Sequence, residues 1–203
     1  MNDLCADPIG SGASRGRILA WLGEGHREVS WALCHLDRER WTRVPAPQLG
    51  AWPALRHVRH LVLNGRHITL PSVQYALGAE PVEPVSTAAL EQADAAWDPI
   101  AAAETADELV SELGSLRFDL LQRLEAAPDS AWAQPIPQAS AADTPSRLDE
   151  LLLRSRQHEL EHLATIWKIA LYWDRVSPPN ERHAPAGSAG LPLHPADRLE
   201  ESH

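Results

Sequence analysis

The 203-residue sequence has little of what marks several large classes of protein. No run of Lys and Arg stands out and the formal net charge is −10, so the positive surface of a phosphate-backbone binder is missing and we expect no nucleic-acid partner. No apolar run approaches the roughly 18–20 residues of a membrane span. The first residues also lack the basic stretch and apolar core of a signal peptide. These absences predict a cytoplasmic protein with no membrane association.

Cysteine is scarce, and no strand pattern stands out. Cys5 and Cys34 are too few for a disulfide framework, and an inert buried thiol is the usual role of a lone cysteine such as Cys34. No segment of useful length alternates between apolar and polar residues as a half-buried strand does. Phe occurs once but Trp eight times, which is more than one core of this size usually needs. The sequence thus predicts an all-α protein, and its tryptophan surplus favours a homodimer.

What the sequence does contain is four amphipathic helices, seen as apolar residues spaced three and four apart. The first is predicted from Ser14 to near Trp41, and the second from Trp52-Pro53 towards Pro71. The inward positions of the first are Ile18, Leu22, Gly25, Val29, Ala32 and Leu36. Those of the second are Leu55, Val58, Leu61, Val62 and Ile68.

The third predicted helix opens with the capping box Thr105-x-x-Glu108 and ends before Pro128. The fourth opens at Thr144-Pro145 and runs to about Asp174. Residues 78–104 show little periodicity and are predicted to form a long connection. The expected fold is a four-helix bundle over residues 14–176, with a long crossover connection between helices two and three. The Pro- and Gly-rich residues 177–203 are predicted to be a flexible tail.

The chemistry lies on the fourth helix. Its predicted inward positions are Leu148, Leu151, Ser155, His158, His162, Thr165, Ile169 and Tyr172. Histidines four residues apart lie on one helix face, one turn above the other, so their ring nitrogens can converge on one ion. Burying both rings without a strong partner costs several kcal/mol, and metal ligation removes that cost. The pair His158 and His162 therefore predicts a divalent-metal site.

A third ligand has to come from another helix, and the second helix offers His57, His60 and His67. The stripe through Val58 and Leu61 places His57 at its edge and His60 further round, so the hydrophobic pattern mildly prefers His57. Spacing alone does not select one of the three.

Several segments resemble the DinB-like family of metal-binding four-helix bundles, whose relatives include thiol-dependent S-transferases and mycothiol-dependent maleylpyruvate isomerases. The resemblance covers most of residues 14–174. The segments that carry it are Trp52-Pro53, Arg56-His57-Val58-Arg59-His60-Leu61, Asp94-Ala95-Ala96-Trp97, Gln157-His158-Glu159-Leu160-Glu161-His162 and Ala170-Leu171-Tyr172-Trp173-Asp174. In that family one histidine of a His-Leu pair and two of a His-x-x-x-His hold the metal, which implies His60, His158 and His162 here.

The resemblance also implies a reaction class, although it assigns no catalytic residue. We expect a metal-dependent transferase that uses a low-molecular-weight thiol and a small-molecule substrate, with zinc or nickel, and iron also compatible with the imidazole ligands. Family members often carry an acidic residue shortly after the first ligand, where this chain has Asn64, Gly65 and Arg66. The alternative is a non-enzymatic, dimeric bundle that binds a metal or another ligand.

The segment His158-Glu159-Leu160-Glu161-His162 also satisfies the H-E-x-x-H pattern of zinc proteases. In those enzymes the first Glu activates a water on the metal. Glu181 is the candidate downstream ligand, but it falls in the predicted tail and no sheet is predicted beside the helix. Glu159 and Glu161 are instead expected to face solvent, since each is turned about 100° from the neighbouring histidine.

Overall fold

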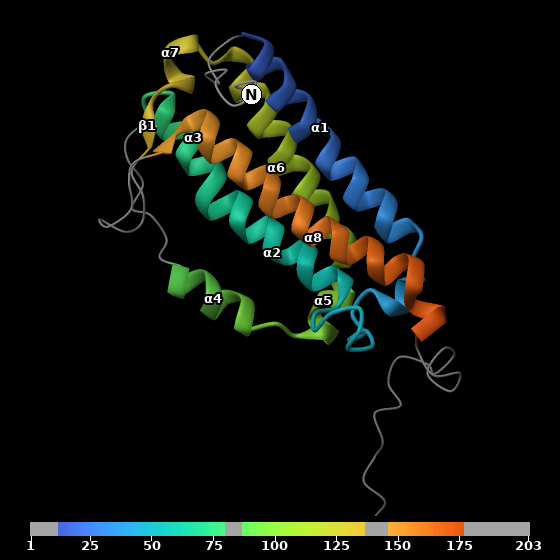
Figure 1. Ribbon diagram of the computed structural model, residues 1–203. Coiled ribbons are helices and arrows are strands. Elements are labelled where there is room, and N and C mark those ends of the chain that lie inside the picture. The colour runs from blue at the N-terminus through green and yellow to red at the C-terminus, as the bar shows by residue number, and fades with distance from the viewer. Residues whose placement is uncertain (1–11, 80–86, 137–145, 177–203) are drawn as a thin grey trace, which may run out of the picture.

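The computed structural model describes residues 12–79, 87–136 and 146–176, and it confirms the all-α prediction (Figure 1). The helices are α1 (Gly12–Cys34), η1 (Arg38–Arg40), α2 (Ala54–Asn64), η2 (Gly65–Thr69), α3 (Leu70–Ala76), α4 (Thr87–Ala95), α5 (Pro99–Glu104), α6 (Ala106–Ala126), α7 (Asp129–Trp132) and α8 (Leu148–Val176). Two short strands, β1 (Pro135–Ile136) and β2 (Ser146–Arg147), pair antiparallel. The predicted tail over 177–203, with Glu181 in it, and the predicted helix start at Thr144-Pro145 lie outside the described residues.

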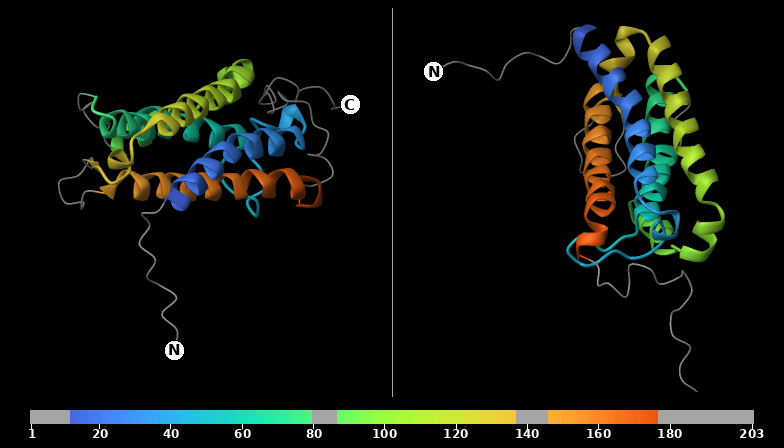
Figure 2. Two further views of the ribbon diagram at one scale, coloured as in Figure 1. Left: turned by 90° about the horizontal axis from the view of Figure 1, so that it is seen from above. Right: turned by 90° about the vertical axis from the view of Figure 1, so that its right-hand side faces the viewer.

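Four long helical segments lie side by side: α1, α2 continued by α3, α6 and α8 (Figures 1 and 2). Helix α1 packs against α8 and α6, and α2 packs against the same two helices. Helices α2 and α6 run in the same direction, so the chain between them returns along the molecule (Figure 1). This return is the crossover that the sequence predicts, and it carries α4 and α5, two short helices that the sequence reading did not find.

The sequence pattern of α1 is confirmed at every position. All six residues of the predicted inward stripe are buried, five of them in α1 and Leu36 just beyond its end. The helix nevertheless ends at Cys34, earlier than the predicted end near Trp41, and a separate 3₁₀ turn follows at Arg38–Arg40. Cys34 is exposed, which corrects the expectation of a buried thiol.

The second helix departs from prediction at a single π-helical turn, Gly65–Thr69. A π turn holds one more residue than an α turn, so the inward position moves one residue along the chain. Thr69 is therefore buried where Ile68 was predicted, and Ile68 is exposed. Pro71 does not end the helix, because it occupies the first turn of α3, where no N–H is needed, and α3 continues to Ala76.

Helix α6 begins after Thr105 as predicted, but the predicted capping bond is absent from it. The Thr105 hydroxyl instead donates to the Ala101 carbonyl oxygen at 3.0 Å. Capping occurs in the preceding turn, where an oxygen of Asp98 accepts from the backbone N–H of Ile100 at 2.9 Å. Helix α5 thereby forms a separate turn before α6.

The core divides into two apolar clusters along the bundle. One contains Leu22, Leu120, Leu124, Leu148 and Leu152 among others. The second contains Val29, Leu33, Leu113, Leu163 and Ile166 among others. Between the two clusters, α1, α6 and α8 contribute small or charged residues, namely Gly25, Arg117, Arg156 and Glu159. None of the described helices is long and apolar enough to span a membrane.

Candidate metal centre

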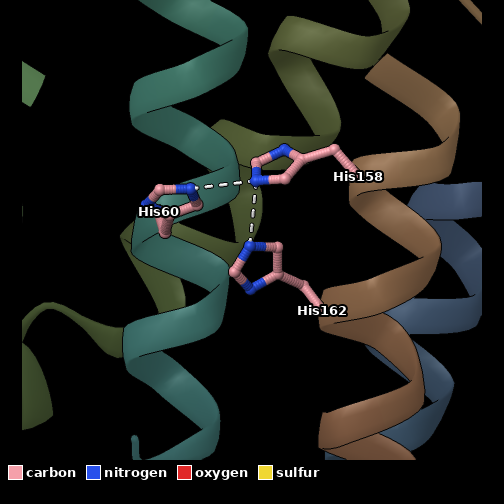
Figure 3. Close-up of side chains that lie close together, drawn as sticks. All are labelled: His60, His158 and His162. Atoms are coloured by element: carbon pink, nitrogen blue, oxygen red, sulfur yellow. Dashed lines mark hydrogen bonds between the residues drawn. The ribbon is translucent and has the colours of Figure 1, made fainter. Parts of the chain in front are cut away.

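Three histidine rings point toward one another between α2 and α8 (Figure 3). His60 comes from α2, and His158 and His162 come from consecutive turns of α8. The Nε2 atom of His158 lies 3.1 Å from Nε2 of His60 and 3.1 Å from Nε2 of His162. All three rings are partly buried. The structure thus brings together the three residues that the resemblance selects.

This spacing fits a shared ion. Two nitrogens that bind one zinc ion at about 2.1 Å are about 3.0 to 3.4 Å apart, for angles from a right angle to the tetrahedral one. The two observed separations of 3.1 Å lie in this interval. Three imidazoles from a protein leave at least one further coordination position for a water or a substrate, as in catalytic zinc sites.

Asp94 of α4 fixes the orientation of His60. One oxygen of its buried carboxylate accepts from Nδ1 of His60, which puts the ring proton on Nδ1 and leaves the Nε2 lone pair facing the cluster. Arg59 lies 4.0 Å from the other oxygen, and Arg56 donates to the Asp94 backbone carbonyl at 3.3 Å. The crossover therefore brings a carboxylate to His60, although no acidic residue closely follows His60 in the sequence.

His57 supports His162 rather than joining the cluster. Its Nδ1 lies 2.7 Å from Nδ1 of His162. The tautomer that leaves Nε2 of His162 for an ion has the Nδ1–H of His162 donating to His57. His57 is buried, and its own Nε2 has no partner within the described residues. The hydrophobic pattern of the second helix favoured His57, and His57 is indeed buried. Burial does not decide, however, which histidine ring points toward the other two.

The surroundings favour the neutral form of His57, His158 and His162, and a histidine that binds a metal has to be neutral. Burial, together with the nearby His60 and Arg56, lowers the pKa of His57 to about 4. Burial and the neighbouring histidines lower the pKa of His162 to about 3. The pKa of His158 is also lowered, mainly by burial. Protons compete weakly for these nitrogens near neutral pH.

An aromatic side chain covers one side of the cluster. The Trp52 ring centroid lies 5.4 Å from that of His57, 5.6 Å from that of His60 and 6.1 Å from that of His162. The guanidinium of Arg56 lies 4.3 Å from the Trp52 ring, a cation–π arrangement that holds the indole in place. The Trp52-Pro53 segment that begins α2 is thus part of the site.

The buried face of α8 is rotated from the predicted one. The residues buried along it include Leu152, Arg156, Glu159, Leu163, Ile166 and Trp173. His158 and His162 lie beside this stripe and are half-buried, and Tyr172, predicted inward, is exposed. The prediction that Glu159 faces solvent is wrong, since its side chain is 1% exposed, whereas Glu161 is exposed as predicted.

Glu159 belongs to a buried ion-pair network that crosses the bundle. Arg117 donates to one of its oxygens at 2.6 Å and Arg156 to the other at 2.9 Å. Arg156 also donates to Glu28 at 2.7 Å. The zinc-protease interpretation needs this carboxylate to accept a proton from water at the metal. Two guanidinium groups already engage both of its oxygens, so the geometry disfavours that interpretation.

Two features of the site were not assigned by sequence reasoning. Asp94 stood in a segment that carried the family resemblance, but it lies 34 residues from His60 and its contact depends on how the crossover folds. The Arg56 and Arg59 pairings with α4 depend on the same fold. His67, the remaining candidate on the second helix, is not among the described residues that converge for an ion.

The comparisons agree with this geometry. No curated protein and no solved structure matches the chain. The family model described as DinB superfamily matches residues 22–166, a span that contains α2, α4, α6 and all three converging histidines. The chain belongs to the DinB superfamily.

Proposed function

We propose that this protein is a metal-dependent transferase that acts on a low-molecular-weight thiol and a small-molecule substrate. The observation that carries the proposal is the convergence of three Nε2 atoms from His60, His158 and His162. Asp94 accepts from Nδ1 of His60, which leaves the Nε2 lone pair of that ring facing the cluster. The tautomer of His162 whose Nδ1–H donates to His57 leaves its Nε2 lone pair facing the cluster too. In that tautomeric state an ion at the point of convergence can be bound by both rings.

The donor set suits zinc or nickel, and iron is compatible. A bound divalent ion would supply Lewis acidity that lowers the pKa of a coordinating thiol into the neutral range. The residues around the cluster position the histidine rings. Asp94 and His57 hold two of the rings in place, and Trp52 excludes water from one side of the cluster. We place the protein in the cytoplasm as a homodimer, with no nucleic-acid or membrane partner.

A screen of thiols and electrophiles tests this proposal. Metal-loaded protein would be incubated with glutathione, bacillithiol or mycothiol and a panel of electrophiles, with loss of free thiol as the readout. We expect turnover for wild type and none for His162→Ala, which removes one converging nitrogen. Thiol binding, followed separately by calorimetry, should weaken in the same variant. Thiol binding that is unchanged in His162→Ala would overturn the mechanism even if a reaction is found.

A non-enzymatic, metal-binding bundle is the second candidate, and one observation favours it. The two buried carboxylates beside the histidines are already engaged, Glu159 by two arginines and Asp94 by His60. Neither of these two carboxylates is thus free to act as a general base. This function predicts that the ion binds tightly while no thiol is consumed with any electrophile.

A further inference from the structure

Helix α4 lies beside the four long helical segments and packs against α2 (Figure 1). It is nine residues long, and helices shorter than about 12–15 residues are marginal in water unless tertiary contacts hold them. Of residues 89–96, only Asp94 is buried, and Leu90 and Ala93 are partly buried. The most buried side chain in this range is thus a carboxylate rather than an apolar group, so the docking of α4 depends strongly on the contacts of Asp94.

Three polar contacts join Asp94 to α2. Its Oδ2 accepts from Nδ1 of His60, and its backbone carbonyl accepts from Arg56 at 3.3 Å. Its Oδ1 lies 4.0 Å from Nη1 of Arg59, and neither of these two atoms has a hydrogen-bond partner within the described residues. Burying a carboxylate costs free energy unless hydrogen bonds and positive charge compensate for it. Additional positive charge at His60 would therefore stabilise the docked position of α4.

The histidine cluster is the place where such charge can be bound. An ion at Nε2 of His60 draws electron density from the ring, so the Nδ1–H becomes a stronger donor to Asp94, as in other carboxylate–histidine–metal arrangements. The ion also brings its own positive charge close to the buried carboxylate. Metal binding at one nitrogen of the His60 ring and docking of α4 at the other nitrogen should thus favour each other.

We propose that α4 is a metal-dependent strap, which closes on α2 through Asp94 when the histidine cluster holds an ion and opens when the ion leaves. The inference rests on the proposed function only through its metal, because neither the thiol nor the electrophile enters it. Coupling between two binding events is reciprocal. A docked α4 therefore also raises the affinity of the cluster for the ion.

Hydrogen–deuterium exchange of the full chain measures this docking, with zinc bound and after its removal by a chelator. Amides of a helix that opens locally exchange in proportion to the open fraction. We expect zinc to slow exchange of the α4 amides at least about tenfold. Exchange in α7, which lies at the opposite end of the bundle from α5 (Figure 1), should change less than about twofold.

Two carboxylates of α4 provide matched variants for this measurement. Asp94→Asn keeps the shape of the side chain and removes its charge. At saturating zinc, verified by metal content, the slowing of α4 exchange by zinc should fall below about threefold in this variant. Glu91→Gln removes an exposed charge from the same helix and should keep the full effect. Slowing in zinc-saturated Asp94→Asn equal to that in wild type would overturn the inference.

Leu90→Ser tests the reciprocal effect, since Leu90 is partly buried on α4 and is not a metal ligand. We expect faster exchange of α4 in this variant and zinc binding that is weaker by at least about threefold, measured by competition with a chelator. Unchanged zinc affinity in a variant whose α4 exchanges rapidly would contradict the coupling.

The zinc titration and the thiol assay separate this inference from the proposed function. A chain that binds zinc tightly and shows no change in α4 exchange would refute the strap and leave the proposed function standing. Zinc-dependent protection of α4 in a protein that consumes no thiol would refute the proposed function and support the strap. A chain that takes up no zinc would refute both.

Discussion

Asp94 illustrates how one carboxylate outside the converging histidines controls the site. It accepts from Nδ1 of His60 and lies buried between α4 and α2. Hydrogen-bonded partners of metal-binding histidines fix the tautomer, and their loss typically costs 10–100-fold in metal affinity. We predict that Asp94→Asn weakens zinc binding by about that factor, measured by competition with a chelator. The amide has the same shape, so lost orientation and charge, rather than a cavity, would be responsible.

A control for this substitution is Asp129→Asn. Asp129 of α7 forms a salt bridge with Arg15 at 3.0 Å, and the side chain of Asp129 is 97% exposed. Its loss should not change zinc affinity. Equal affinities of Asp94→Asn and wild type would show that the hydrogen bond to His60 does not matter for metal binding.

The buried histidines make the metal-free protein sensitive to acid. Burial lowers the pKa of His57 to about 4 and that of His162 to about 3, whereas both titrate near 6.5 in an unfolded chain. As pH falls below about 6.5, the unfolded chain takes up protons that the folded chain does not. The free energy of unfolding should therefore be flat with respect to these groups above that pH and fall below it.

Urea unfolding of metal-free protein between pH 7.5 and pH 5.5 measures this slope, in a range where carboxylates barely titrate. His57→Gln removes one of the two groups, so its slope should be smaller than that of wild type. A stability that rises on acidification, or identical slopes for the two proteins, would contradict the burial argument.

How far these residues could be predicted depends on whether their partners are local. His158 and His162 are four apart on one helix, so their convergence follows from helical geometry alone. His60 required the family resemblance, because the periodicity of the second helix favoured His57, which is buried but donates no nitrogen to the cluster. Asp94 could not be placed, since its contact forms only once the crossover returns to α2.

The close packing of α1 against α8 depends on the absence of a side chain at Gly25. A Cβ built on Gly25 would lie well inside van der Waals contact of the Glu159 carboxylate, which cannot retreat because Arg117 and Arg156 hold it. An alanine favours the helix by roughly 0.5–1 kcal/mol over glycine, but forced overpacking typically costs 1–3 kcal/mol. Gly25→Ala should thus lower the free energy of unfolding, by up to about 2.5 kcal/mol.

Gly16 on the same helix is the matched control. A Cβ at Gly16 meets no atom within 4 Å, so only the helix preference remains, and Gly16→Ala should stabilise the protein by roughly 0.5–1 kcal/mol. Both variants would be compared by urea unfolding of metal-free protein. A stabilised Gly25→Ala would mean that the buried network can shift at little cost.

The helices were predicted correctly where their apolar periodicity is unbroken. The prediction failed where charged residues are buried. Every inward position of α1 was correct. Two stripes of residues on α8 are candidates for the buried face. The one that is buried contains Arg156 and Glu159, and a hydrophobic pattern disfavours a stripe with these charged residues. Their partners Arg117 and Glu28 come from α6 and α1, so no reading of α8 alone could favour that face. The π turn likewise places Ile68 outward, and the spacing of apolar residues in the sequence does not indicate this turn.

The assembled molecule leaves several large apolar side chains exposed on α1 and α8. Trp21 is 39% exposed, Trp31 49% and Leu160 45%. Trp21 and Leu160 line the same groove between the two helices. Such exposed apolar groups favour pairing with a second copy. We predict a homodimer with twice the 22.3 kDa of one chain. Sedimentation that gives one chain per particle at all concentrations would refute it, without bearing on the metal.

The measurement that bears most directly on this account is the metal content of the purified protein. Wild type should contain close to one divalent ion per chain. His57→Ala should retain most of it and His60→Ala should lose it, because of these two residues only His60 contributes a converging nitrogen. The double variant His158→Ala, His162→Ala provides the baseline. The account predicts that wild type stands about one ion per chain above this baseline. A wild-type content equal to that of the double variant would contradict it.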